Sequence, residues 1–163
     1  MDEVTTIEVG ERSRSRMKAK ELEQFLSGHR GQRHIVVLQD FPDPDAISSA
    51  FAHQLISAQF DIAVDVVYER RISHPQNIAL VRLLDLELIR YNEGFDFSPY
   101  TGSVFIDNQG TTTGLLGPLS KAHVPPLMII DHHERQERLH AEFTDIRRIG
   151  ATATIYTEYI QEG

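Results

Sequence analysis

Two carboxylates that lie one residue apart, Asp43 and Asp45, are the first side chains of this sequence whose type and spacing suggest chemistry. They lie in the stretch 39–50, between an apolar run and a segment whose apolar residues repeat at helical spacing. This pattern predicts a tight turn from a strand into a helix, and in open α/β sheets such turns lie where ligands bind. Two acids on a proline-stiffened turn can hold hard metal ions through oxygen. They can also be helix caps, because Asp at a helix start accepts backbone N–H groups and favours the helix dipole.

Two later apolar runs also end in side chains that can bind metals. Asp107 follows one of them, and Asp131, His132 and His133 follow the other. Because the carboxyl ends of parallel strands share one edge of a sheet, we expect these side chains to meet the turn that carries the first two acids. Carboxylates and imidazoles without thiolates suit Mn²⁺ or Mg²⁺, with Zn²⁺ or Fe²⁺ as alternatives. A pair of such ions is a familiar arrangement for the attack of water on phosphorus.

The elements that would position these side chains alternate between strands and helices. Helices are expected over 17–26, 45–58, 74–84 and 150–160, and strands over 35–38, 60–68, 87–91, 103–107, 127–131 and 143–149. Residues 1–16 are predicted to be a mobile polar tail, and 114–126 an irregular segment interrupted by Gly and Pro. The alternation predicts an α/β fold over residues 17–163, with a mostly parallel sheet covered by helices on both faces.

Composition narrows the class of protein. A chain of 163 residues with 40% apolar and 25% charged residues is typical of one soluble globular domain. There is no cysteine, no apolar run long enough to span a membrane and no secretory signal at Met1, so a cytoplasmic location is expected. The net charge of -8 argues against a protein that coats duplex nucleic acid by charge. It does not exclude a small phosphorylated substrate, because bound divalent metals would invert the local field.

The ordered set of motifs resembles the DHH phosphoesterase superfamily. The run Asp131-His132-His133 after an apolar strand looks like its Asp-His-His motif, and Pro42–Ala50 looks like its opening motif. The stretch Ile106–Gln109 looks like its second motif. The segments 72–77 and 150–154 resemble two further stretches that occur in several members. The resemblance runs from the first predicted strand to the end of the chain and implies a DHH-type, Rossmann-like fold.

The resemblance also implies hydrolysis of phosphoester or phosphoanhydride bonds with two divalent ions, commonly Mn²⁺, with Mg²⁺ as an alternative. Carried onto this chain, Asp43 would bind one ion and Asp45 the other. Asp107 would bridge both ions, and His132 would bind the second. Members of the superfamily include oligoribonucleases, cyclic-dinucleotide phosphodiesterases, RecJ-type exonucleases and one family of pyrophosphatases.

Four further residues take roles from the same resemblance. His133 would lie near the substrate phosphate, and Asp131 would orient a histidine without binding an ion itself. His74 and Asn77 would approach the substrate, although capping of a helix start is an alternative for both. The substrate implied is a small nucleotide or a short oligonucleotide, hydrolysed by water that the two metals activate.

The sequence departs from the family pattern in two ways. Gln39 stands where many members have a histidine, and an amide oxygen is a poorer Mn²⁺ ligand than imidazole. A later Asp ligand and the carboxyl-terminal substrate-binding domain are also not found, so we expect the chain to be part of a longer protein or a reduced relative. These departures support an alternative function, a non-catalytic nucleotide-binding or regulatory module of the same fold. The sequence leaves the substrate, the preferred metal and the oligomeric state open, a homodimer included.

Other polar residues have structural explanations. His53 is expected to be a surface or packing residue, and His123 and His140 are expected to be exposed. Arg70 and Arg71 follow a strand, where a solvated loop is favoured over contact with phosphate.

Overall fold

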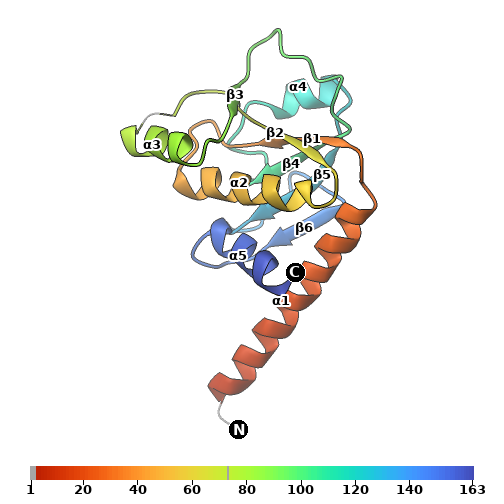
Figure 1. The fold of residues 1–163 in the computed structure, drawn as a ribbon, viewed down its shortest axis with the longest axis vertical. Helices are drawn as coiled ribbons and strands as arrows, with labels where there is room; N and C mark the ends of the chain where they lie inside the picture. The colour runs from red at the N-terminus through yellow and green to blue at the C-terminus, as the bar shows by residue number, and fades with distance from the viewer. Residues whose placement is uncertain (1–2, 73) are drawn as a thin grey trace.

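The computed structural model of the protein describes residues 3–72 and 74–163, which form a six-stranded parallel sheet flanked by helices (Figure 1). The strands are β1 (Arg33–Val37), β2 (Ala63–Tyr68), β3 (Leu88–Arg90), β4 (Gly102–Ile106), β5 (Pro126–Asp131) and β6 (Phe143–Ile146). The helices are α1 (Glu3–Ser27), α2 (Pro44–Ala58), α3 (Pro75–Leu83), α4 (Leu116–Lys121) and α5 (Thr152–Glu162). Each pair of neighbouring strands is parallel, and this confirms the predicted α/β fold.

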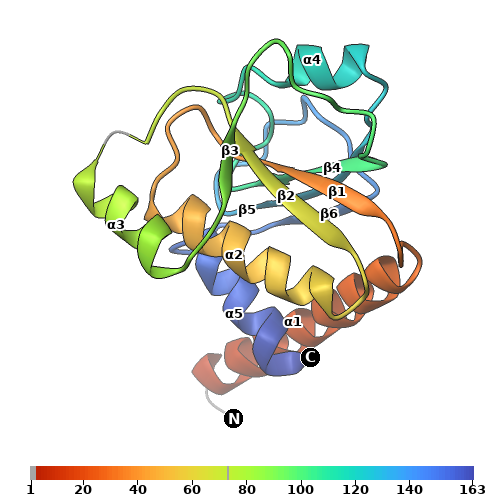
Figure 2. The same cartoon turned by 45° about the horizontal axis from the view of Figure 1, so that its top comes forward.

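Two layers of side chains cover the two faces of the sheet. In β1, Val36 packs toward the larger core, which α1, α2, α3 and α5 complete, whereas Ile35 and Val37 pack toward the other face. The short helix α4 and the long loops cover that second face (Figure 2). Successive side chains of a strand point to opposite faces, so strands covered on both sides read as unbroken apolar runs. The central strand β4 is buried at all five positions for this reason.

The strand order β3-β2-β1-β4-β5-β6 reverses direction between β1 and β4. In sheets of this order, the connections that leave the neighbouring strands at the reversal go to opposite faces and leave a crevice at the carboxyl ends. The turn from β1 into α2 and the residues that follow β4 border this point. The fold therefore brings the acid-bearing turns of the sequence to one edge of the sheet.

The helix α1 begins earlier than the sequence pattern indicates. It starts at Glu3 instead of residue 17, so residues 3–16 are helical and do not form the predicted tail. Ser15 is buried and its hydroxyl donates to Glu158 of α5 at 2.9 Å. This tertiary contact supports a helical conformation that the polar composition of the segment does not suggest. Among the described residues, no helix is both long and apolar enough to cross a membrane.

The helix α4 lies inside the segment that was predicted to be irregular. It is only six residues long and contains Gly117 and Pro118, which the sequence pattern reads as breaks. Leu115 and Leu119 are buried against the second face of the sheet. Burial of these two leucines stabilises a helix that local propensity alone does not predict.

Candidate metal centre

Three acidic or imidazole side chains from distant parts of the sequence meet at the carboxyl edge of the sheet. His132, which follows β5, has its Nε2 atom 3.4 Å from Asp45 Oδ2 and 3.3 Å from Asp107 Oδ1. Asp45 lies in the first turn of α2, and Asp107 directly follows β4. The structure therefore brings these three predicted site residues into contact.

Asp107 is the most perturbed acid of this group. Its side chain is buried, and its backbone lies in the left-handed region with φ 61°. Burial, followed by the charges of Asp45 and Asp43, raises the pKa of Asp107 from 3.8 to about 8. Asp107 is buried, whereas Asp45 is partly buried and Asp43 is exposed, and a divalent cation would relieve the repulsion between these neighbouring carboxylates.

The two acids of the opening turn have different hydrogen-bond partners. Asp43 is the N-cap residue of α2, and its Oδ1 accepts the backbone N–H of Ala46 at 2.9 Å. Asp45 instead reaches α5, where its two oxygens accept the N–H groups of Thr152 at 3.0 Å and Ala153 at 2.8 Å. Both acids therefore hold helix starts, as the capping alternative requires. A carboxylate has about four lone-pair sites, so capping leaves acceptor capacity for a cation.

A hydrogen bond at one ring nitrogen orients His132. Its Nδ1 atom donates to the carbonyl oxygen of Ile149 at 3.1 Å. In the neutral ring, a proton on Nδ1 leaves the Nε2 lone pair for a metal, and Nε2 is the atom that faces Asp45 and Asp107.

Asp131 and His133 form a second, adjoining pair. Asp131 is completely buried, and its Oδ1 accepts the backbone N–H of His132 at 2.9 Å and Nδ1–H of His133 at 2.6 Å. Its Oδ2 accepts from Gln109 at 2.8 Å. The His133 side chain is 49% exposed, so its ring extends from a buried carboxylate toward solvent. Asp131 thus orients a histidine, the geometry that its predicted role requires.

The donor set as a whole fits a divalent metal. Asp107, Asp131, His132 and His133 each offer one ligand atom, and these atoms all lie within 4.8 Å of one another. Carboxylate oxygen and imidazole nitrogen are donors for Mn²⁺ and Zn²⁺, and the carboxylates alone suit Mg²⁺.

The remaining predicted site residues lie around this cluster without a described contact to it. Gln39 is partly buried just beyond β1, and no described hydrogen bond joins its side chain to the acids. His74 is exposed at the N-cap position of α3 and makes no side-chain capping bond there. Asn77 is buried and donates to the carbonyl oxygen of Pro42 at 3.3 Å. Asn77 therefore contacts the loop that leads to the opening acids, and the approach of His74 and Asn77 to a substrate stays a prediction.

Two side chains that organise the site, Gln109 and Thr152, were not predicted as site residues from the sequence. Gln109 is buried; besides its bond to Asp131, its Oε1 accepts the N–H of Gln136 at 2.9 Å. Thr152 is buried, and its hydroxyl donates to Asp107 Oδ1 at 2.9 Å. Both residues lie in stretches that resemble family motifs, and this resemblance could have identified them as site residues.

A separate group of histidines lies in the interior, away from the carboxyl edge. His53 of α2 is fully buried and shares a 2.9 Å hydrogen bond with the Tyr156 hydroxyl, so it is a packing residue. Burial lowers the pKa of His53 to about 3 and that of His34 to about 4. His123 and His140 are exposed, as predicted.

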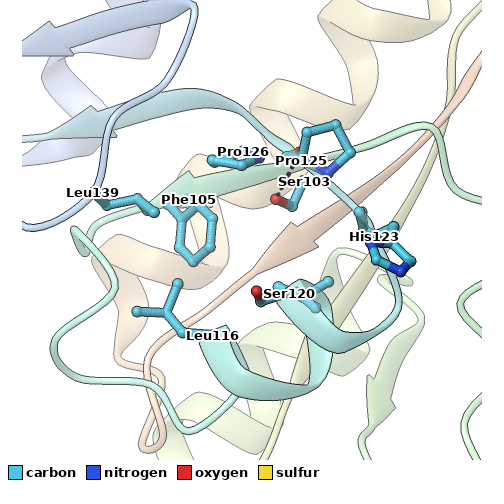
Figure 3. A pocket seen from close by; sticks show the side chains of 10 residues that line it. Ser103, Phe105, Leu116, Ser120, His123, Pro125, Pro126 and Leu139 are labelled. Carbon is cyan, nitrogen blue, oxygen red and sulfur yellow. Dashed lines mark hydrogen bonds between the residues drawn. The ribbon is translucent and has the colours of Figure 1, made fainter.

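Two cavities lie outside the cluster. One of about 400 Å³ lies between α4 and the starts of β4 and β5, where Phe105, Leu116 and Pro126 form much of its wall (Figure 3). None of the ten residues that line it belongs to the predicted site. A smaller cavity of about 240 Å³ lies beside Gln109, with Arg135 and His140 in its lining. Only the smaller cavity shares a residue with the hydrogen-bond network of the candidate centre.

One curated protein is similar to this chain in sequence. The chain is 34% identical over 122 residues to uncharacterized protein MJ1633 of Methanocaldococcus jannaschii, a match that covers 74% of this chain and 24% of that protein. The chain thus spans about a quarter of the length of this relative. No protein-family model matches the sequence.

Solved structures with a similar fold include an exopolyphosphatase-related protein from Bacteroides fragilis. The TM-score is 0.67 at 16% identity, and the match covers 90% of this chain and 44% of that one. CDC45 from Entamoeba histolytica matches with a TM-score of 0.48 at 15% identity, over 91% of this chain and 30% of that one. At this level of identity, the similarity to the exopolyphosphatase-related protein shows a common fold and nothing more.

Proposed function

We propose that this chain is a metal-dependent phosphohydrolase domain that cleaves a phosphoester or phosphoanhydride bond. The observation that carries the proposal is the contact of His132 with both Asp45 and Asp107 at the carboxyl edge of the sheet. The motifs that resemble the DHH phosphoesterase superfamily supply these same residues. The fold shared with an exopolyphosphatase-related protein is compatible with this activity.

In this proposal, Asp45, Asp107 and His132 hold divalent cations, Mn²⁺ in the first instance and Mg²⁺ as an alternative, and Asp43 contributes to a second ion. The raised pKa of Asp107 supports the assignment, because a buried carboxylate beside two other acids favours binding of a positive charge. Bound divalent cations would lower the pKa of a water molecule and neutralise charge on the phosphate oxygens. Gln39 would be a weak additional ligand.

His133 has the role of proton donor to the leaving oxygen. Its Nδ1–H bond to the buried Asp131 fixes the orientation of the ring, and its other nitrogen is available to a substrate. Asp131 keeps its own orientation through Gln109 and the backbone N–H of His132. The pair therefore resembles the carboxylate–histidine arrangements that many enzymes use in acid–base catalysis.

The substrate we propose is a small nucleotide or a short oligonucleotide. The net charge of -8 disfavours binding of long duplex nucleic acid, whereas a short phosphorylated molecule can be held by cations at the site. The polar cavity beside Gln109 has Arg135 in its lining, which could bind a further anionic group beside the acidic Glu137.

The alternative is a nucleotide-binding module without turnover. It is favoured by Gln39 at a position where the family pattern has histidine, and by the two backbone N–H groups that already occupy the Asp45 oxygens. Such a module would bind nucleotide without tight binding of Mn²⁺.

The test combines Mn²⁺ calorimetry with hydrolysis of a generic phosphodiester and of adenosine bisphosphate. We expect Mn²⁺ to bind and support turnover, and Asp107→Ala to abolish both. His123→Ala changes an exposed histidine outside the cluster and is the matched control. Equal rates for Asp107→Ala and wild type would refute the enzymatic proposal. Nucleotide binding without Mn²⁺ affinity or turnover would favour the alternative.

A further inference from the structure

One short segment contacts three of the side chains to which we assign cations, namely Asp45, Asp107 and His132. The segment 149–153 joins β6 to α5. The carbonyl oxygen of Ile149 accepts from His132 Nδ1 at 3.1 Å. The hydroxyl of Thr152 donates to Asp107 Oδ1 at 2.9 Å. The backbone N–H groups at the start of α5 donate to Asp45.

We propose that Thr152 is a positioning residue, and that through it the segment 149–153 sets the relative placement of Asp45, Asp107 and His132 for cation binding. This inference rests on the proposed function, because it concerns the same site. Thr152 acts through the ligands and does not itself bind the cation. The ligand set of the sequence analysis assigned the segment no role.

The chemistry of Thr152 suits this role. It is the only residue of the segment that reaches two of the acids, since its N–H donates to Asp45 and its hydroxyl to Asp107. A bound cation would keep Asp107 ionised, and a buried hydrogen bond to an ionised acceptor is stronger than a neutral one. The two donors offset part of the repulsion between carboxylates that would otherwise move apart.

The start of α5 needs an acceptor from elsewhere in the chain. The N-cap residue of α5 is Ala151, which makes no side-chain capping bond. The first N–H groups of a helix have no partner within the helix and carry a partial positive charge. Asp45 of α2 supplies the missing acceptor for Thr152 and Ala153. The capping requirement of one helix thus fixes the orientation of an acid on another.

The segment is itself anchored on the side away from the acids. Tyr156 of α5 shares a hydrogen bond with the buried His53 of α2, and the hydroxyl of Tyr159 donates to Asp145 of β6. Both tyrosines are buried in the larger core. Because α5 is held by contacts that do not involve the ligands, Thr152 can impose a position on the acids instead of following them.

The test measures Mn²⁺ affinity by calorimetry at one fixed pH for wild type and for variants at Thr152. Thr152→Val keeps the shape but lacks the hydroxyl donor, and we expect about tenfold weaker binding. Thr152→Ser restores the donor and should bind like wild type. Thr154→Val changes an exposed threonine of the same helix and is the matched control.

A second control separates positioning from general loosening of α5. Tyr159→Phe removes the bond to Asp145 without touching a ligand, while the bond between Tyr156 and His53 still anchors α5. It should therefore lower the melting temperature and leave Mn²⁺ affinity close to that of wild type. If Thr152→Val binds Mn²⁺ as tightly as wild type, or if Tyr159→Phe weakens binding as much, the positioning role is overturned. If wild type does not bind Mn²⁺ at all, the proposed function fails, and the positioning role fails with it.

A measurement without metal tests the geometry independently. In amide NMR spectra of the metal-free protein, Asp45→Asn should move the proton signals of Thr152 and Ala153 upfield, because a neutral acceptor makes a weaker hydrogen bond. The amide of Thr154, which donates to Ala151, should not move and is the internal reference. Unchanged signals for Thr152 and Ala153 would overturn the placement of Asp45 by α5, whatever the metal affinity.

Discussion

The buried imidazole of His53 predicts a steep loss of stability on mild acidification. His53 is completely buried between α2 and α5, and desolvation, with a smaller contribution from His34, lowers its pKa from 6.5 to about 3. The folded protein therefore keeps this ring neutral at pH values at which the unfolded chain already binds a proton. Stability is fully present above pH 6.5 and falls as the pH drops toward the folded pKa.

The size of the effect follows from the difference between the two pKa values. Each pH unit in this window lowers the free energy of unfolding by about 1.4 kcal/mol for one such group. From pH 6.5 to pH 4, His53 alone would therefore lower stability by about 3 kcal/mol. Because whole domains are stable by only about 5–15 kcal/mol, this loss is large enough to measure. His34, whose pKa burial lowers to about 4, adds to the loss in the same direction.

The assay is urea unfolding with EDTA at four pH values between 7 and 4. His53→Gln keeps a polar partner for Tyr156 but cannot titrate, so it should be less stable than wild type at pH 7 and should lose less stability on acidification. The difference in the free energy of unfolding between wild type and His53→Gln should shrink by about 3 kcal/mol between pH 7 and pH 4. His123→Gln, at an exposed position, should follow wild type at every pH. Parallel curves for wild type and His53→Gln would refute the reasoning.

Three further variants test the site. Asp107→Asn removes the carboxylate whose pKa burial and neighbouring acids raise to about 8, so it should weaken Mn²⁺ binding at least about 100-fold in calorimetry. A raised acid pKa lowers stability as the pH rises through it, so at pH 9 the metal-free variant should melt at a higher temperature than wild type. Gln39→His introduces a better ligand and should tighten Mn²⁺ binding about tenfold in the same calorimetric assay. Gln109→Ala removes the partners of Asp131 Oδ2 and of two backbone groups and should lower the free energy of unfolding in urea by about 2 kcal/mol.

The sequence pattern predicted the strands that are covered by side chains and helices or loops on both faces of the sheet. Strands β1, β4 and β5 are covered on both faces, and their unbroken apolar runs identified them. The alternation of strands and helices then required a parallel sheet, and a parallel sheet brings Asp45, Asp107 and His132 to one edge. Convergence of these residues was therefore predictable from the spacing of apolar runs.

Features that depend on tertiary contacts were not predictable in this way. The first half of α1 is polar, and its docking on α5 through Ser15 leaves no periodic signal. Histidine occurs both in protein interiors and at surfaces, so its identity does not predict its burial. His53 is buried because α2 packs against α5. Thr152 looks like an ordinary helix-start residue until its donors are seen to meet acids more than 40 positions away in the chain. In each case the role of the residue depends on a partner that is distant in the sequence.

The two readings of the opening acids, helix caps or metal ligands, turn out not to exclude each other. Asp43 caps its own helix, whereas Asp45 caps α5, so the turn secures two helices with adjacent carboxylates. The hydrogen bonds that secure the helices also restrict the carboxylates to one orientation, and a restricted ligand pays less entropy when a cation binds. It follows that a loss of activity on changing Asp45 would combine two effects, a missing ligand and a displaced α5. Asp107 contacts α5 through the hydroxyl of Thr152 and not through a backbone N–H, so Asp107→Asn, which keeps an oxygen acceptor for that hydroxyl, removes the charged ligand with less disturbance of α5.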